Sequence, residues 1–166
     1  MRFKLIIFIC FPFILLGCDN HLFSQFFRNP HIVDMFSAKK IKSVEWSKFN
    51  VDVTALNRNQ MIRLIFDGSE PENLNFSTEI IASDSTYDRD VFVSSKWPNF
   101  EIEIEIVATS NEGKKYQFRP KGQSTGILFF PESDIDLMGL KFTTIDIRSN
   151  VSLDNVNATW ISYTSK

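Results

Sequence analysis

Cysteine and histidine are scarce in this chain. The only cysteines are Cys10 and Cys18, and the only histidines are His21 and His31, all close to the N-terminus. A histidine-dependent triad or a zinc site would have to be built from that terminal segment alone. No CxxC or HExxH motif occurs, and no phosphate-binding glycine loop. These absences argue against the common nucleophilic, zinc-dependent and nucleotide-binding enzymes.

Excess basic charge and long apolar runs are missing as well. The 18 basic side chains are outnumbered by 20 acidic ones, so nothing predicts a nucleic-acid surface. After residue 18 no apolar run approaches the roughly 20 residues that a membrane-spanning helix needs. We find no internal repeat and no low-complexity tract. The remaining length fits one globular domain with its own core.

What is present begins with the N-terminal stretch "MRFKLIIFICFPFILLGCDN". Arg2 and Lys4 precede twelve uncharged apolar residues, 5–16, which is the length of a signal-peptide core and too short to span a bilayer. Leu15 and Gly17 then precede Cys18. This pattern resembles the lipobox of bacterial lipoproteins, although Leu16 stands where a small residue is commoner. The resemblance covers only residues 1–20.

The resemblance implies that Cys18 is the lipid attachment site and the first residue of the mature protein. Residues 1–17 would be a signal peptide that is removed, residues 18–38 the lipidated N-terminus and tether, and residues 39–166 a single domain. Two or more acyl chains such as palmitate give stable membrane anchoring, whereas one is marginal. The only remaining cysteine would be used, so no disulfide is expected. Without Arg2 and Lys4, 16 basic side chains face 20 acidic ones, a net charge of −4.

Two polar residues follow Cys18. Asp19 directly after the cysteine resembles the signal that retains enterobacterial lipoproteins in the inner membrane, and Asn20 can reinforce it. The resemblance therefore implies an inner-membrane protein that faces the periplasm. As an alternative, both residues are simply polar side chains at a chain terminus.

The expected tether is unusually apolar. Leu22, Phe23, Phe26 and Phe27 recur at spacings that would align them on one helical face. Such a segment could lie in the membrane interface, or it could pack on the domain as its first element. The Asn29-Pro30 pair favours a chain break before the domain.

The domain itself reads as strands. In "FEIEIEIV", residues 100–107, apolar and acidic side chains alternate, which is typical of a strand with one buried face. A three-residue loop with Gly113 in the left-handed position would place Ile106 opposite Phe118. The same register places Glu105 opposite Arg119 and Glu103 opposite Lys121. Pro120 should end its strand or lie at a sheet edge.

Further strand candidates repeat along the chain with turn-rich segments between them. They are "IKSVEW", "FNVDVTAL", "MIRLIFDG", "LNFSTEII", "DVFVSSKW", "YQFRPKG", "GILFFP", "LKFTTIDIRS" and "NATWISYT". This pattern predicts an all-β fold, and we expect an antiparallel two-sheet β-sandwich of jelly-roll type. The first and last strands would pair in such a fold, and Trp46 and Trp160 would share its core.

Candidate binding residues are few. The loop 83–90 carries Asp84, Asp88 and Asp90, which could ligate calcium, but Arg89 and the spacing argue for an ordinary turn. Paired acids such as Asp134 and Asp136 could do acid/base work on a glycoside, but solvated loops capped by Asp side chains are far commoner. We predict no metal and no cofactor. Trp97 and Phe100 in "KWPNF" are the best candidates for an aromatic binding loop.

These observations favour a non-catalytic function. The first hypothesis is a membrane-anchored lipoprotein that binds another protein, as an accessory subunit of an envelope complex or as an immunity protein against a toxin. The alternative is a carbohydrate- or small-ligand-binding jelly-roll module, which rests on analogy of fold alone. An enzyme is the least favoured of the three.

Overall fold

The chain folds into eleven β-strands. The computed structural model describes residues 27–69, 74–80, 88–94, 97–124, 126–132 and 135–165, and no helix occurs among them. The strands are β1 (Phe27–Ile41), β2 (Ser47–Thr54), β3 (Asn59–Ile65), β4 (Leu74–Ile80), β5 (Asp88–Ser94), β6 (Trp97–Ile102), β7 (Ile104–Ser110), β8 (Lys115–Ser124), β9 (Gly126–Pro131), β10 (Lys141–Ser149) and β11 (Leu153–Ser165).

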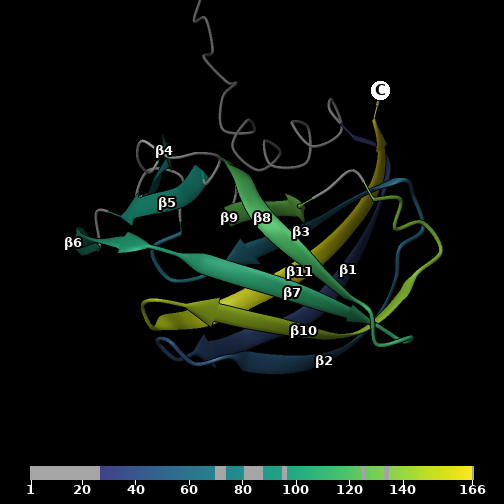
Figure 1. The fold of residues 1–166 in the computed structure, drawn as a ribbon, viewed down its shortest axis with the longest axis horizontal. Coiled ribbons are helices and arrows are strands. Elements are labelled where there is room, and N and C mark those ends of the chain that lie inside the picture. The colour runs from purple at the N-terminus through teal and green to yellow at the C-terminus, as the bar shows by residue number, and fades with distance from the viewer. Residues whose placement is uncertain are drawn as a thin grey trace, which may run out of the picture.

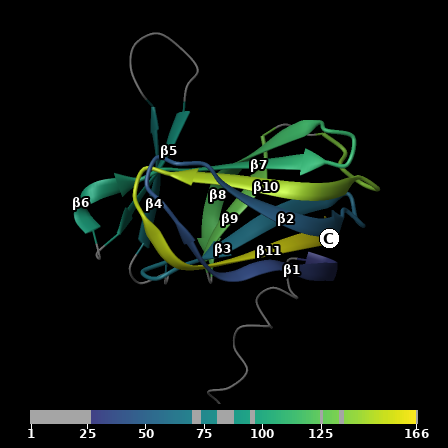
Figure 2. The same ribbon diagram turned by 90° about the horizontal axis from the view of Figure 1, so that it is seen from below.

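Eight of these strands form one antiparallel sheet that is nearly closed into a barrel. Its order is β1-β11-β3-β9-β8-β7-β10-β2, and β4, β5 and β6 form a separate three-stranded sheet at one end (Figures 1 and 2). The prediction of an all-β antiparallel fold is confirmed. The finer prediction, a two-sheet sandwich, is not confirmed, because one sheet curls around the core instead of two sheets facing each other.

The two edges of the curled sheet are β1 and β2. No backbone ladder joins them, but Phe36 of β1 and Phe49 of β2 stack with ring centroids 4.0 Å apart. β1 is able to bend toward β2 because its pairing with β11 shifts register at four places along its length. Aromatic packing therefore closes the seam where hydrogen bonds do not.

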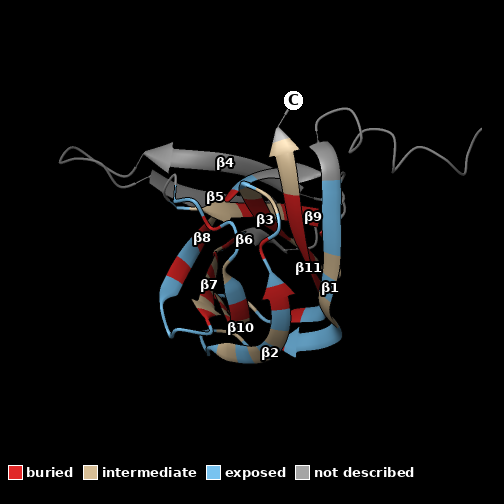
Figure 3. Ribbon diagram, turned by 90° about the vertical axis from the view of Figure 1, so that its right-hand side faces the viewer, coloured by how far each residue is buried: buried red, intermediate tan, exposed pale blue. Residues whose placement is uncertain are grey.

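Large apolar side chains fill the barrel interior, and Figure 3 marks the buried residues along the strands in red. Trp160 of β11 lies at its centre, with the Phe118 and Phe142 rings at 5.4 and 4.7 Å between centroids. The Trp160 indole N–H donates a hydrogen bond to Gln60 Oε1 at 2.7 Å, and the Ser162 hydroxyl donates to the same oxygen at 2.6 Å. Because these buried polar groups are hydrogen-bonded to one another, burying them costs little free energy of folding.

The hairpin predicted between residues 100 and 122 forms in the expected register. Ile106 lies opposite Phe118 and Ala108 opposite Tyr116, and the turn uses Gly113 at φ +80°. The ladder between β7 and β8 ends at Ile106 and Phe118, before the Glu–Arg and Glu–Lys oppositions that the register extrapolates. Glu105 instead lies opposite Arg148 of β10.

Several predicted strands need correction. Pro120 does not end its strand, because β8 continues to Ser124 and pairs with β9 through a register shift after Pro120. The ladder of β8 with β7 stops at Phe118, so at Pro120 the described ladders join β8 to β9 alone, in keeping with the predicted edge position. The segment "IKSVEW" is not a strand, because Ile41 ends β1 and a turn follows. β1 itself begins at Phe27, within the stretch assigned to the tether, so residues from Phe27 onward pack on the domain.

Some features follow the sequence closely. β9 has the bounds of the apolar run "GILFFP" and lies between β3 and β8 in the interior of the sheet order. Gly126 opens it at φ +99°, and a Cβ there would overlap the Leu64 carbonyl oxygen of β3. The first and last strands of the chain, β1 and β11, pair with each other as expected, although β1 precedes the segment predicted to be the first strand.

Candidate functional site

The candidate site lies at the end of the barrel where three connections meet. The turn between β1 and β2 is attached to the turn between β10 and β11: Ser43 Oγ donates to the Asn150 carbonyl oxygen at 2.7 Å. The Val44 N–H donates to the Ser149 carbonyl oxygen, also at 2.7 Å. These bonds hold Val44 at φ +57°, a left-handed conformation that is unfavourable for a β-branched residue.

The same turn exposes two apolar side chains. Val44 is 72% exposed and Trp46 is 45% exposed. The prediction that Trp46 shares the core with Trp160 is therefore wrong. The left-handed residue Val44 breaks the strand alternation just before Trp46, so the indole lies on the outer surface of the barrel.

Arg148 joins this apolar turn to the acidic face of β7. Its guanidinium lies 5.0 Å from the centre of the Trp46 ring, and its Nη2 donates to Glu105 Oε1 at 2.5 Å. Strand pairing explains why Trp46, Arg148 and Glu105 lie side by side. Arg148 of β10 pairs with Glu105 of β7, and the preceding Ile147 pairs with Ser47 of β2, the residue after Trp46. The Arg148 guanidinium is therefore held between an indole ring and a carboxylate.

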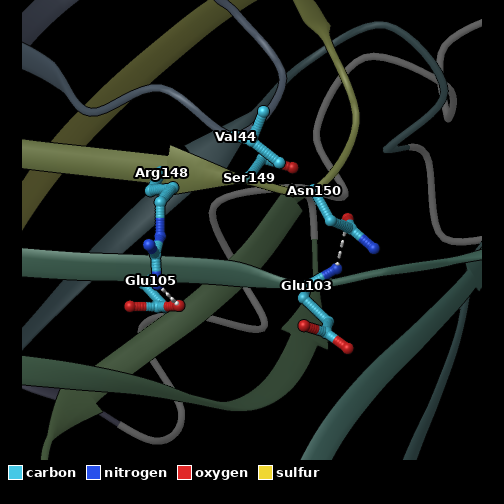
Figure 4. Close-up of a pocket in the computed structure, with 6 residues that line it drawn as sticks. All are labelled: Val44, Glu103, Glu105, Arg148, Ser149 and Asn150. Atoms are coloured by element: carbon cyan, nitrogen blue, oxygen red, sulfur yellow. Dashed lines mark hydrogen bonds and ion pairs between the residues drawn. The ribbon is translucent and has the colours of Figure 1, made fainter.

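Asn150 organises the point where the barrel meets the small sheet. Its Oδ1 accepts the Glu103 N–H at 2.9 Å (Figure 4). Its Nδ2 donates to the Glu101 carbonyl oxygen at 2.6 Å. The Asn150 N–H also donates to the Glu103 carbonyl oxygen at 3.2 Å. Asn150 thus continues the pairing of β10 with β7 beyond Ser149, at the point where the alternating run 100–107 divides between two sheets.

A pocket of about 190 Å³ lies between these groups. It is lined by Val44, Glu103, Glu105, Arg148, Ser149 and Asn150, with the Arg148 and Glu105 side chains extending toward each other at one side (Figure 4). Pockets that enclose a drug-sized ligand have volumes of roughly 300–1,000 Å³. The volume therefore suits one inserted side chain better than a whole small molecule.

The residues singled out from the sequence are not brought together here. Cys18, Asp19 and Asn20 lie outside the described residues, as do Asp84 and Asp134. Trp97 and Phe100 lie on β6, but their side chains are outside the described part of the structure. Asp88 and Asp90 lie on β5, with their backbones opposite Ile80 and Thr78 of β4.

Sequence reasoning missed the residues that form this site. Val44 and Trp46 were assigned to one predicted strand and Arg148 to another, with no indication that they meet. Arg148 and Glu105 lie opposite each other on neighbouring strands, and this pairing can be predicted only when the strand order is known. The left-handed conformation of Val44 could not be predicted, because valine rarely adopts it.

No other chemical site emerges from the described residues. They bring no three histidine, cysteine or carboxylate side chains together in a way that could hold a metal ion. His31 is exposed on β1. Among the same residues, no helix has the length and apolar character needed to span a membrane.

Comparison with known proteins gives no family. No protein-family model matches the chain, and no curated protein matches its sequence. Function must therefore be argued from the residues and their geometry.

Proposed function

We propose that this protein is a membrane-anchored lipoprotein that faces the periplasm and binds another protein without catalysis. The observation that carries the proposal is the exposed turn of Val44 and Trp46, adjoined by Arg148. Tryptophan and arginine are the residue types most enriched among the strongest contributors to protein interfaces. We call this surface, made of Val44, Trp46, Glu103, Glu105 and Arg148, the turn surface.

The anchor is argued from the sequence. Leu15, Gly17 and Cys18 follow the apolar stretch as in a lipobox, and lipid attachment at Cys18 would hold the domain at the bilayer. Asp19 and Asn20 support retention in the inner membrane. An accessory subunit of an envelope complex and a toxin-immunity protein are the two roles that suit an anchored binding domain.

Two features favour a protein partner over a sugar. The pocket is about 190 Å³, too small to enclose most free ligands. The Arg148 guanidinium lies over the Trp46 ring and competes with a sugar for stacking there.

The exposure of Trp46 nevertheless supports a carbohydrate-binding module as the second candidate, since an exposed indole next to carboxylates is able to stack on and hydrogen-bond a sugar. A glycan array decides between the two candidates. Binding that is lost in Trp46→Ala would favour the sugar, and an array without binding would remove that candidate.

We assign no catalytic residue. Lipid attachment would consume the thiol of Cys18, and His31 stands alone on β1.

The proposal is tested in two steps. Cys18→Ser should abolish labelling with radioactive palmitate and release the protein from membranes. A variant that still labels and fractionates with membranes would overturn the anchor. Affinity isolation of the lipidated protein from membranes should then yield a partner that Trp46→Ala loses and Leu56→Ala retains. Leu56 is the matched control because it is 50% exposed on the opposite turn, between β2 and β3.

A further inference from the structure

Three large apolar side chains are exposed at the end of the barrel opposite the turn surface. Leu56 lies in the β2–β3 connection, while Ile135 and Met138 precede β10 and are 45% and 61% exposed. The two connections are joined, because the Gly139 N–H donates to the Ala55 carbonyl oxygen at 2.7 Å. Ala55 donates its own N–H back to the same connection at 2.9 Å. We call this surface, made of Leu56, Ile135 and Met138, the apolar end.

The exposure of Met138 is built into the fold. The neighbouring Leu137 is fully buried in the core, so the connection holds Leu137 inside the barrel and Met138 outside it. The Met138 N–H donates to Asp136 Oδ1 at 3.0 Å. The Leu140 N–H donates to the Leu137 carbonyl oxygen, also at 3.0 Å, and Gly139 lies between them at φ +84°. Met138 therefore cannot turn inward unless Leu137 leaves the core.

The chain that follows the proposed anchor enters the domain at this same end. Phe27 opens β1 opposite Ser165, the last residue of β11. Leu56 is joined to the same part of β11, because its N–H donates to Ser162 Oγ at 3.4 Å. Ser162 and Ser165 are three strand residues apart, which is roughly 10 Å. Figure 1 shows residues 135–140 in yellow-green on the right-hand side, where the C-terminal end of β11 also lies. The apolar end therefore adjoins the point where the chain enters.

The chain between the anchor and the domain is short. Phe27 follows Cys18 by nine residues, which extend at most about 30 Å when fully stretched. Val44 and Trp46 lie beyond the far end of β1, whose 15 residues measure roughly 45 Å along the strand. An upright domain with the turn surface on the headgroups would hold Phe27 farther from the bilayer than this chain reaches. Of these two exposed apolar surfaces, the apolar end is the one that the anchor brings to the membrane.

Resting on the proposed lipid anchor, we infer that the apolar end contacts the bilayer to which Cys18 is attached. Its three side chains insert between the lipid headgroups and bury their apolar area there. The same two connections carry exposed charges of both signs, such as Arg58 and Asp136, so the contact is apolar and should form on zwitterionic lipid. The contact adds to the hold of the acyl chains, and it directs the turn surface away from the membrane toward a water-soluble partner.

The contact is tested by nitroxide quenching of fluorescent labels on the lipidated protein in phosphatidylcholine liposomes. With residues 1–17 removed and Cys18 lipidated, Met138→Cys provides a single free thiol at the apolar end. Val44→Cys provides the matched control, because its side chain is also exposed but lies on the turn surface. Nitroxide in the headgroup region quenches only near contact, so the label at position 138 should be quenched at least about threefold more strongly. Equal quenching at both positions would overturn the contact.

The apolar side chains themselves are tested by replacing them. A label at Ile135→Cys reports the contact while Leu56 and Met138 are present. The double variant Leu56→Asn/Met138→Asn should reduce the quenching of that label at least about threefold, because it removes the apolar area that enters the bilayer. Val44→Asn is the control and should leave the quenching unchanged, while melting temperatures verify that the variants fold. Quenching that persists in the double variant would overturn the inference.

Failure of the anchor and failure of the contact are distinguishable. If palmitate labelling at Cys18 is absent, the anchor fails, and the contact fails with it because nothing then holds this end at a bilayer. If labelling is present but the labels at positions 138 and 44 are quenched equally, the anchor stands and only the contact is wrong.

Discussion

Trp160 and Trp46 are the same residue type in opposite environments. Trp160 lies fully buried among Phe118 and Phe142, with its N–H bonded to Gln60. Trp46 lies on the outer surface next to an exposed Val44, with Arg148 over its ring. The first environment satisfies every requirement of a core, whereas the second leaves apolar area in water. The comparison separates the part of the molecule that holds the fold from the part that is available to a partner.

The sharpest way to break this comparison is to remove each ring in turn. Trp160→Ala should cost about 3–5 kcal/mol of unfolding free energy, because it empties the centre of the barrel. Trp46→Ala should change stability by less than about 0.5 kcal/mol, as is usual for surface substitutions. Urea denaturation measures both. Trp160→Phe provides a milder variant if the alanine variant fails to fold, and a Trp46→Ala loss of similar size would contradict the distinction.

The sequence reveals the interior better than it reveals the surface. Alternation in the run 100–107 correctly places Ile102, Ile104 and Ile106 inside, and a glycine turn fixes the register with Phe118. Both are local signals, since side-chain direction and hairpin register depend on neighbouring residues. Closure of the sheet is not local. It depends on β1 meeting β2 through Phe36 and Phe49, a contact that the alternation of either strand does not specify.

The turn surface was even harder to predict from the sequence. It combines residues from the β1–β2 turn, the end of β10 and the start of β7, and these meet only because the strand order places β10 between β7 and β2. Trp46 was predicted inside because the first and last strands were expected to pair in the core of the fold. A hydrogen bond from Val44 N–H to Ser149 reverses that expectation, and it depends on the fold.

The junction between the barrel and the small sheet offers a second test. Asn150→Ala removes the two side-chain hydrogen bonds to the backbones of Glu101 and Glu103, and it should cost about 1–2 kcal/mol. Asn111→Ala in the β7–β8 turn serves as the control and should be nearly neutral. Thermal unfolding of both variants checks this, and an equal effect of the two would show that Asn150 does not organise the junction.

A substitution in the strained turn at Val44 should have a smaller effect, and it should raise the stability of the domain instead of lowering it. Asparagine tolerates the left-handed conformation better than a β-branched residue does, so Val44→Asn should stabilise the domain by about 1 kcal/mol. The same variant should weaken partner binding, because it removes apolar area from the turn surface. Denaturation and binding are measured in parallel. Unchanged stability would contradict the strain, and unchanged binding would remove Val44 from the surface.

The smallest expected effect concerns alkaline pH. Burial raises the pKa of the Tyr163 hydroxyl above 10.0, its usual value. The folded state then holds the phenol proton more tightly than the unfolded state, so stability is full below pH 10 and falls as the pH rises toward the folded pKa. Tyr163→Phe should flatten this part of the stability–pH curve. Curves that remain parallel above pH 10 would count against the assignment.

The most direct test of the central claim is photo-crosslinking from position 44 in living cells. A benzophenone amino acid is placed at Val44 or, as the control, at Leu56 of the lipidated protein. The account predicts one dominant protein adduct from position 44 that disappears in Arg148→Glu, with no such adduct from position 56. Equal adducts from both positions, or none from position 44 in a protein that carries its lipid, would contradict it.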